Sequence, residues 1–197
     1  MKNNIAKREK SRLRRMANST GSCGILLDLG FAQCANPFLK ADRIVGVDPN
    51  AVEKPPNYDE VFNGTVADYI YVHGAGSVDS LVVGELLEHL EDPLDFLREC
   101  YNALAPGGKL VLSTPNPNSP IERLLTITLS RKYFYTRQHV FLFPQRWLIR
   151  IIEMVGFTDV RLRSGGFPVP YFGLIPFPRP WCYQSIVIAR KSNADSL

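Results

Sequence analysis

The stretch that decides the fold is "VDSLVVGELLEHLEDPLDFLRECYNALAPGGKLVLSTPN", residues 78–116. It begins with a short apolar run, residues 78–85, of the kind that forms a buried parallel strand. The next segment repeats apolar residues every three to four positions, and Pro93 suits its first helical turn. A Pro-Gly-Gly ends this helix, and a second apolar run, residues 109–116, follows. Strand, helix and strand in this order predict one unit of a parallel sheet.

The same alternation extends to both sides of this stretch. Further strands are expected in "GILLDLG" (24–30), "RIVGVDPN" (43–50), "DEVFNG" (59–64), "TDVRLRS" (158–164) and "QSIVIARK" (184–191), and an amphipathic helix in "PQRWLIRIIEMVGF" (144–157). Strands that alternate with helices predict an α/β fold with a doubly wound, mostly parallel sheet of seven strands and helices on both faces. In such sheets ligands bind beyond the carboxyl ends of the strands, where Asp28, Asp48 and Glu85 are expected.

Composition limits the class of protein. The chain has 197 residues, of which 45% are hydrophobic and 21% charged, so it can form one domain with a sizeable core. No apolar run approaches the roughly 20 residues that span a bilayer. Its four cysteines are scattered without a C-x-x-C pair, which favours reduced thiols over a zinc ribbon or a disulfide scaffold. We therefore expect a soluble, cytoplasmic domain.

Charge is concentrated at the beginning of the chain. The first 20 residues contain seven Lys and Arg and one Glu, whereas the rest of the chain is slightly acidic. We expect residues 1–20 to form a basic N-terminal arm, residues 21–191 the domain, and residues 192–197 a tail. The arm is interpreted either as a frayed, solvated leader or as a segment that contacts phosphates on nucleic acid, lipids or sugars.

The segment "SVDSLVVGELLEHLEDPLDFLRECYNALAPGGKLVLSTPNPNS" resembles the central block of class I S-adenosylmethionine-dependent methyltransferases. The most similar members methylate quinones, sugars and polysaccharides. The resemblance covers residues 22–115 and, with "HVFLFPQRWLIRIIEMVGF", extends to residues 137–163. It implies a Rossmann-like sheet with an antiparallel last strand, S-adenosylmethionine as cofactor, and methyl transfer as the activity.

By position, the resemblance assigns the family's glycine-rich turn to Asp28 and Gly30. Ala32 and Cys34 stand where the family pattern has two further glycines. Both are small, so a ligand could still approach the backbone, although neither reaches positive φ as easily as glycine. Only 12 residues separate Gly30 from Arg43, so the usual first helix is expected to be short or displaced.

Three further acidic residues complete the cofactor site that the resemblance implies. Asp48 would bind the ribose hydroxyls, a role that also follows from chemistry because a carboxylate can accept from two vicinal hydroxyls. Asp68 lies near the position of the adenine contact, although Gly64-Thr65 replaces the Gly-Asp that the family often has there. Glu85 would lie beside the sulfonium and the acceptor.

The sequence "GELLEHLEDP" places Glu85, Glu88 and His89 close together. If a helical turn begins at Glu85, all three share one face. With His139 they could hold a divalent metal, as a similar cluster does in small-RNA 3′-end methyltransferases. Many relatives with a similar sequence need no metal, so we favour an organic role, with His139, His89 and Glu85 as catalytic candidates. A histidine suits removal of a hydroxyl proton.

Two other segments bear on the acceptor. Residues 116–143 correspond to the region that shapes the substrate pocket in this superfamily. Residues 164–183 are rich in proline and aromatic residues, and are expected either to touch a membrane interface, a lipid-linked substrate or a partner, or to pack on their own domain. The leading hypothesis is O-methylation of a small or glycan- or lipid-linked acceptor. The alternatives are a metal-dependent RNA 3′-end methyltransferase, with nucleic acid less favoured, and a non-catalytic binding protein.

Overall fold

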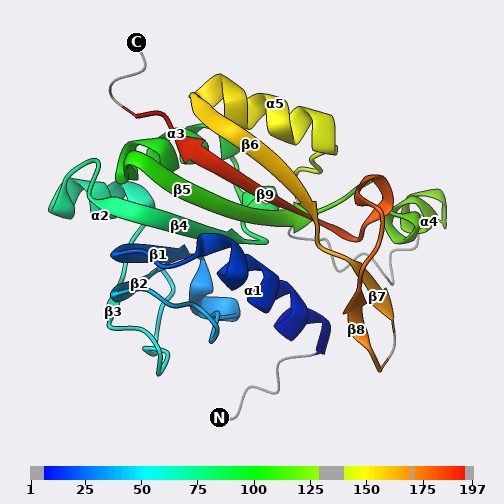
Figure 1. The fold of residues 1–197 in the computed structure, drawn as a ribbon, viewed down its shortest axis with the longest axis horizontal. Coiled ribbons are helices and arrows are strands. Elements are labelled where there is room, and N and C mark those ends of the chain that lie inside the picture. Colours follow the sequence, from blue (N-terminus) through cyan, green and yellow to red (C-terminus); the bar gives the residue numbers. More distant parts are fainter. Residues whose placement is uncertain (1–6, 129–139, 170, 194–197) are drawn as a thin grey trace.

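The computed structural model describes residues 7–128, 140–169 and 171–193 (Figure 1). Its centre is a seven-stranded sheet in the order β3 (Glu60–Phe62), β2 (Arg43–Val47), β1 (Ile25–Leu29), β4 (Val78–Gly84), β5 (Leu104–Pro115), β9 (Gln184–Lys191) and β6 (Phe157–Ser164). β9 runs antiparallel to both β5 and β6, whereas the pairs formed by β1 to β5 are parallel. The predicted fold class is therefore confirmed, including the antiparallel last strand.

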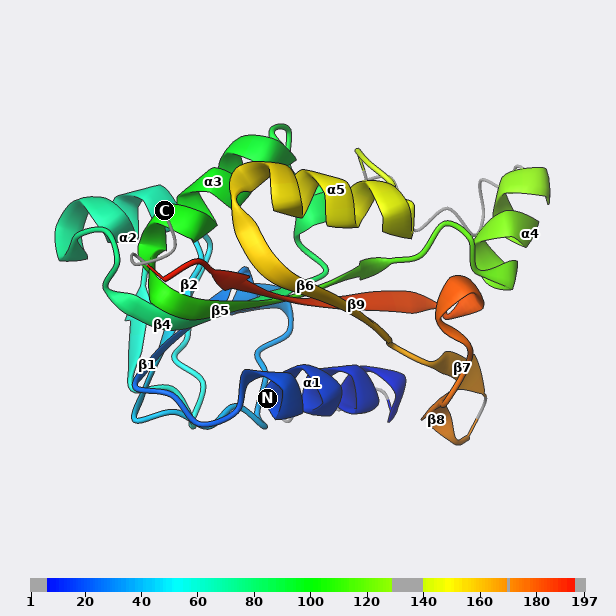
Figure 2. The same cartoon turned by 45° about the horizontal axis from the view of Figure 1, so that its top comes forward.

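Helices cover both faces of the sheet (Figure 2). One face carries α2 (Val66–His73), α3 (Pro93–Ala103) and α5 (Gln145–Val155), and the other carries α1 (Lys7–Thr20). Alternate residues of β1 enter the two cores: Leu27 and Leu29 pack in the larger one, Leu26 in the core that contains Met16 of α1. This alternation is the period of a strand that is buried on both faces.

Helix ends follow signals that the sequence carries. Asp92 caps α3 by accepting a hydrogen bond from the Asp95 amide at 2.9 Å, and Pro93 takes the first turn. α5 ends at Gly156, whose φ of 115° is a conformation that favours glycine. Both ends were predicted.

Additional elements lie beyond the carboxyl end of β5 (Figure 1). They are α4 (Pro120–Thr128), a hairpin of β7 (Phe167–Val169) and β8 (Gly173–Ile175), and the 3₁₀ turn η3 (Arg179–Trp181). The proline- and aromatic-rich segment thus combines buried residues, such as Leu174, with an exposed tip at Tyr171 and Phe172.

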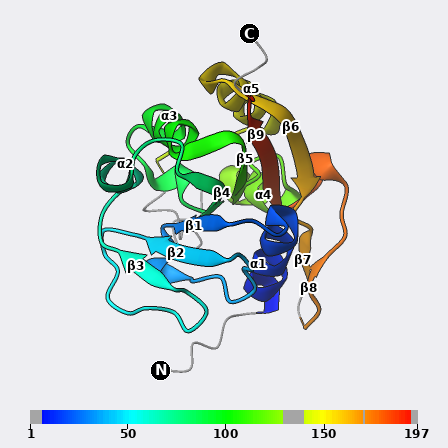
Figure 3. The same cartoon turned by 60° about the vertical axis from the view of Figure 1, so that its left-hand side comes forward.

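The interpretation of the arm as a frayed leader is wrong for Lys7–Thr20. This segment is a regular helix that buries Leu13 and Met16 against the sheet, because these two residues share one helical face. Much of its positive charge is used inside the domain: Lys7 donates to the backbone of the β7–β8 hairpin at 2.9 Å, and Arg15 does so at 3.2 Å. Figure 3 shows α1 alongside this hairpin.

None of the helices in the described ranges combines the length and the apolar character that crossing a bilayer requires. All four cysteines fall within those ranges and are free thiols.

Candidate active site

A cavity of about 750 Å³ lies at the carboxyl ends of the parallel strands, where the topology predicts a ligand site. The loops that follow β1 to β5 line it, together with the first turns of α1, the start of α3 and the beginning of β9. Its lining includes Arg8, Glu9, Arg12, Gly30, Gln33, Cys34, Asp48, Thr65, Gly84, Glu85, His89, Glu122, Tyr183 and Gln184. The cavity therefore collects side chains from most of the chain's length.

Gly30 forms the turn that leaves β1. Its φ is 72°, its amide donates to Val47 O at 2.9 Å, and a Cβ built on it would lie 3.0 Å from the Leu86 side chain. Both the backbone angle and the close approach favour glycine here. The chain then makes the short 3₁₀ turn η1 (Phe31–Gln33), so the prediction of a short first helix is confirmed.

Ala32 and Cys34, which stand where the family pattern has glycines, do not disturb this turn. Among the described residues, positive φ outside glycine occurs only at Glu85, Asp159 and Tyr171, so neither Ala32 nor Cys34 occupies a backbone conformation that needs glycine. Instead, the Ala32 amide donates to the Asp48 carboxylate at 3.1 Å. The turn is thus closed by a side chain from the neighbouring strand.

Asp48 follows β2 and lines the cavity with most of its surface buried. One carboxylate oxygen accepts from Ala32, and the other accepts from the Asn50 amide at 2.7 Å. Two backbone donors fix the carboxylate, and each oxygen keeps a lone pair for further donors. Vicinal hydroxyls are donors of the kind that such a carboxylate binds.

Asp28 is not among the residues that line the cavity. It is buried, and accepts a hydrogen bond from the Tyr58 hydroxyl, which itself accepts from the Asn36 amide at 3.0 Å. Burial raises the pKa of Asp28 to about 7, although the Tyr58 hydrogen bond opposes this change. Its visible contacts brace the loop behind the glycine turn, and its predicted cofactor contact stays a prediction.

Asp68 also lies outside the cavity lining. Its carboxylate accepts from the Thr65 amide and from the Thr65 hydroxyl, and the Asp68 amide donates to that hydroxyl at 3.2 Å, which completes the capping box of α2. These hydrogen bonds lower the pKa of Asp68. Gly64, Thr65 and Val66 line the cavity where the sequence placed the adenine contact at Asp68.

The expectation of a helical turn that begins at Glu85 is wrong. Glu85 has φ 54°, and the 3₁₀ turn η2 (Leu87–His89) begins two residues later. His89 and Glu85 line the cavity, whereas Glu88 is completely buried and accepts from the Thr114 hydroxyl at 3.1 Å. Burial and the neighbouring Glu85 raise the pKa of Glu88 to about 8, and burial also raises the pKa of Glu85.

The alternative metal site finds no support within the described ranges. There, no group of three or more His, Cys, Asp and Glu side chains is arranged to hold a metal ion. His139, the predicted fourth ligand and catalytic candidate, lies outside the described residues. His73, the third histidine, ends α2 and stacks on Tyr69, 4.3 Å between ring centroids.

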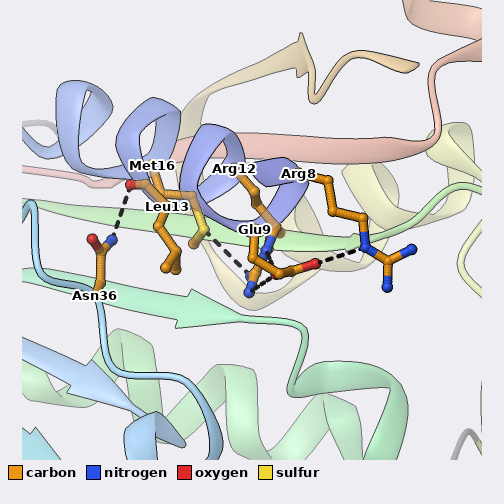
Figure 4. Close-up of polar contacts among 7 residues, drawn as sticks. Arg8, Glu9, Arg12, Leu13, Met16 and Asn36 are labelled. Atoms are coloured by element: carbon orange, nitrogen blue, oxygen red, sulfur yellow. Dashed lines mark hydrogen bonds and ion pairs between the residues drawn. The ribbon is translucent and has the colours of Figure 1, made fainter. Parts of the chain in front are cut away.

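Sequence reasoning missed the contribution of α1 to the cavity. Arg8, Glu9 and Arg12 all line it, and Figure 4 shows the Arg12 side chain between Glu9 and Met16. One signal was present: Arg12 stands four residues before Met16, so it shares the face of the helix that packs on the sheet. No such signal marked Glu122 of α4, Tyr183 just before the last strand, or Gln184 at the start of that strand.

Comparison with known proteins agrees with this geometry. The profile of a methyltransferase domain family matches residues 10–162. A mitochondrial ubiquinone biosynthesis O-methyltransferase of Schizosaccharomyces pombe is 40% identical over 96 residues, 44% of this chain and 34% of that protein. A tRNA U34 carboxymethyltransferase of Haemophilus influenzae is 30% identical over 130 residues, 61% of this chain and 40% of that protein. Both relatives are thus matched over less than half of their own length.

A solved structure shares the fold. The SAM-dependent methyltransferase of Thermotoga maritima superimposes with a TM-score of 0.72 at 16% identity, over 93% of this chain and 89% of that one. The family profile matches more than half of the chain and includes most of α1, which the structure places on the sheet. The chain belongs to the methyltransferase domain family and has the class I fold of S-adenosylmethionine-dependent methyltransferases.

Proposed function

We propose that this chain transfers a methyl group from S-adenosylmethionine to a hydroxyl oxygen of a small or a glycan- or lipid-linked acceptor. The observation that carries the proposal is the cavity at the carboxyl ends of β1, β2 and β4, with Gly30 and Asp48 on its wall. Family membership supports methyl transfer, and the ubiquinone O-methyltransferase relative supports oxygen as the acceptor atom.

The residues present fit this cofactor. Gly30 has no side chain, whereas a Cβ at this position would crowd the Leu86 side chain on the cavity wall. Asp48 offers a fixed carboxylate for the ribose hydroxyls. Thr65 and Val66 line the cavity beyond β3, where an adenine ring would lie. Glu85 has a buried oxygen, Oε1, without a hydrogen-bond partner among the described residues, and a carboxylate there would face the cationic end of the cofactor.

S-adenosylmethionine supplies an activated methyl group, so the protein's tasks are alignment, exclusion of water and removal of the acceptor proton. His89 is the described residue that best suits the last task, because it lines the cavity and an imidazole accepts a proton near neutral pH. His139 remains a second candidate from the sequence.

The surroundings of the cavity favour an acceptor with an apolar part. α4 contributes Glu122 to the cavity, while Leu124 and Ile127 of the same helix are exposed. Tyr171 and Phe172 are exposed at the tip of the β7–β8 hairpin. An amphiphile could place its hydroxyl beside His89 and its apolar part along such side chains, which would also bring the protein to a membrane surface.

The proposal is tested by measuring S-adenosylhomocysteine formation with a panel of hydroxylated acceptors. Each aromatic or glycan acceptor is offered with and without an apolar tail, and a short RNA serves as the competing acceptor. We expect turnover with a hydroxylated acceptor, more with the tail, and no loss of activity in chelator. Turnover only with RNA and added Mn²⁺ or Mg²⁺ would support the RNA 3′-end alternative. Absence of cofactor binding by folded protein would support the non-catalytic alternative.

A further inference from the structure

The buried side chains of Asp28 and Glu88 and the partly buried one of Glu85 lie at the carboxyl ends of β1 and β4, and a buried arginine, Arg12, interacts electrostatically with all three. Arg12 of α1 is 3% exposed, and its charge lowers the pKa of Asp28, Glu85 and Glu88 against the opposing effect of burial. An arginine is stable in such a place only when hydrogen-bond acceptors and negative charges surround it. The arrangement therefore ties the N-terminal helix to the centre of the site.

The contacts of the guanidinium are well defined (Figure 4). Nε and Nη2 each lie 2.9 Å from Glu9 Oε2, and Nη1 donates to the Ser113 hydroxyl of β5 at 3.1 Å. Nη1 also lies against Gly84, because a Cβ built there would be only 2.9 Å from it. The guanidinium thus packs on the residue that precedes Glu85.

Ser113 links Arg12 to Glu85. Its carbonyl accepts from the Glu85 amide at 3.0 Å, and its hydroxyl accepts from Arg12 at 3.1 Å. Burial raises the pKa of the Glu85 carboxyl, and Arg12, Ser113 and Gln184 oppose this change. Glu85 has a left-handed backbone angle, φ 54°, which persists only where neighbouring contacts enforce it.

We propose that Arg12 is a positioning residue that holds the Glu85 carboxylate at the cavity, so that α1 is a functional part of the cofactor site. Glu9 does not explain the burial of this arginine by itself. The Glu9 side chain is 25% exposed and can be hydrated when Arg12 is removed, whereas Glu85 lines the cavity with its Oε1 shielded from solvent and without a hydrogen-bond partner among the described residues, so it depends more on the nearby guanidinium. The inference rests on the proposed function, since it concerns the same cavity.

A double-mutant cycle tests it. Affinity for S-adenosylmethionine is measured by calorimetry, and folding by urea titration, in Arg12→Met, Glu85→Gln and the double variant. Arg12→Met is expected to weaken binding by about tenfold in the wild-type background and by less than about threefold beside Glu85→Gln, because residues of one network are coupled. Arg14→Met, which removes an exposed cation stacked on Phe38, is the matched control and leaves the affinity unchanged.

A second measurement decides the matter if Arg12→Met does not fold. Ser113→Ala removes the linking hydroxyl with little change of volume, and should weaken binding in the wild type but not beside Glu85→Gln. In folded Arg12→Ala, millimolar methylguanidinium should restore part of the affinity, because the arginine site opens on the cavity. The inference would be overturned if Arg12→Met lost the same affinity for S-adenosylmethionine with Glu85 as with Gln at that position, and methylguanidinium gave no rescue. Binding by the wild type would then still leave the proposed function intact. Failure of the wild type to bind would instead overturn the proposed function.

Discussion

The carboxylate of Asp48 accepts a hydrogen bond from the backbone N–H of Ala32 at 3.1 Å. This contact joins the end of β2 to the turn after β1, at the position where the family's motif usually has a glycine. The same carboxylate would bind the ribose hydroxyls in the proposed site. The turn after β1, which lacks two of the family's glycines, and Asp48 are therefore parts of one arrangement.

Restoring the glycines should bring no benefit. In Ala32→Gly and Cys34→Gly we expect affinity for S-adenosylmethionine within about threefold of wild type, and a loss of roughly 0.5–1 kcal/mol in the free energy of unfolding, because glycine adds backbone freedom to the unfolded chain. Calorimetry and urea titration measure the two effects. An increase in affinity of tenfold or more would show that these side chains obstruct the cofactor.

Gly30 should be sensitive to any side chain. Gly30→Ala combines an unfavourable φ of 72° with a Cβ placed 3.0 Å from Leu86, so it should lower both stability and cofactor affinity. Gly74→Ala is the matched control, since Gly74 has φ 86° but no atom within 4 Å of the new Cβ. The control should lose about 1 kcal/mol of stability through its backbone angle alone. Equal losses in both variants, with unchanged affinity, would refute the steric role of Gly30.

The buried Asp28 makes the stability dependent on pH. Its pKa is about 7 in the folded protein against an ordinary value of 3.8, so the folded state keeps a proton that the unfolded state has lost. This contribution is fully present below pH 3.8 and disappears as the pH rises through about 7. Asp28→Asn does not titrate, so its free energy of unfolding relative to wild type should rise by roughly 2–4 kcal/mol between pH 4 and pH 8. A difference that is independent of pH would contradict this assignment.

A substitution of Asp68 distinguishes the adenine contact that the sequence predicts from the helix cap that the structure shows. If its carboxylate serves only the capping box of α2, Asp68→Ala should lower the melting temperature and leave the affinity for S-adenosylmethionine unchanged. Thr65→Ala removes the other half of the same box and should destabilise similarly. A marked loss of affinity in Asp68→Ala alone would restore the predicted adenine contact.

Much of the fold could be predicted because its signals are local. The apolar runs and the Pro93 and Gly156 punctuation locate β1, β4, β5, α3 and α5 to within a few residues. α1 was misjudged because charged residues dominate its sequence. Its apolar pair, Leu13 and Met16, indicates burial only once the sheet on which it packs is known. The hairpin β7–β8 has short, proline-containing strands that carry no clear alternation.

The site was predictable only where the fold itself brings residues together. Asp48 and Gly30 follow parallel neighbouring strands, so their meeting at the cavity follows from topology. For Asp68 the sequence alone does not separate two roles, because a helix cap and a ligand contact demand the same kind of side chain at the start of α2. Arg12 reaches Ser113 across 101 positions of sequence, a contact that no local pattern encodes.

The most direct test of the central claim is the affinity of the folded chain for S-adenosylmethionine in the wild type, in Asp48→Ala and in Asp42→Ala, measured by calorimetry. Asp42 is an exposed aspartate just before β2, so it controls for loss of charge. We predict micromolar binding by wild type and Asp42→Ala, and a loss of at least about tenfold in Asp48→Ala, because the fixed carboxylate is removed. Equal affinity in all three proteins, or no binding by the folded wild type, would contradict the account.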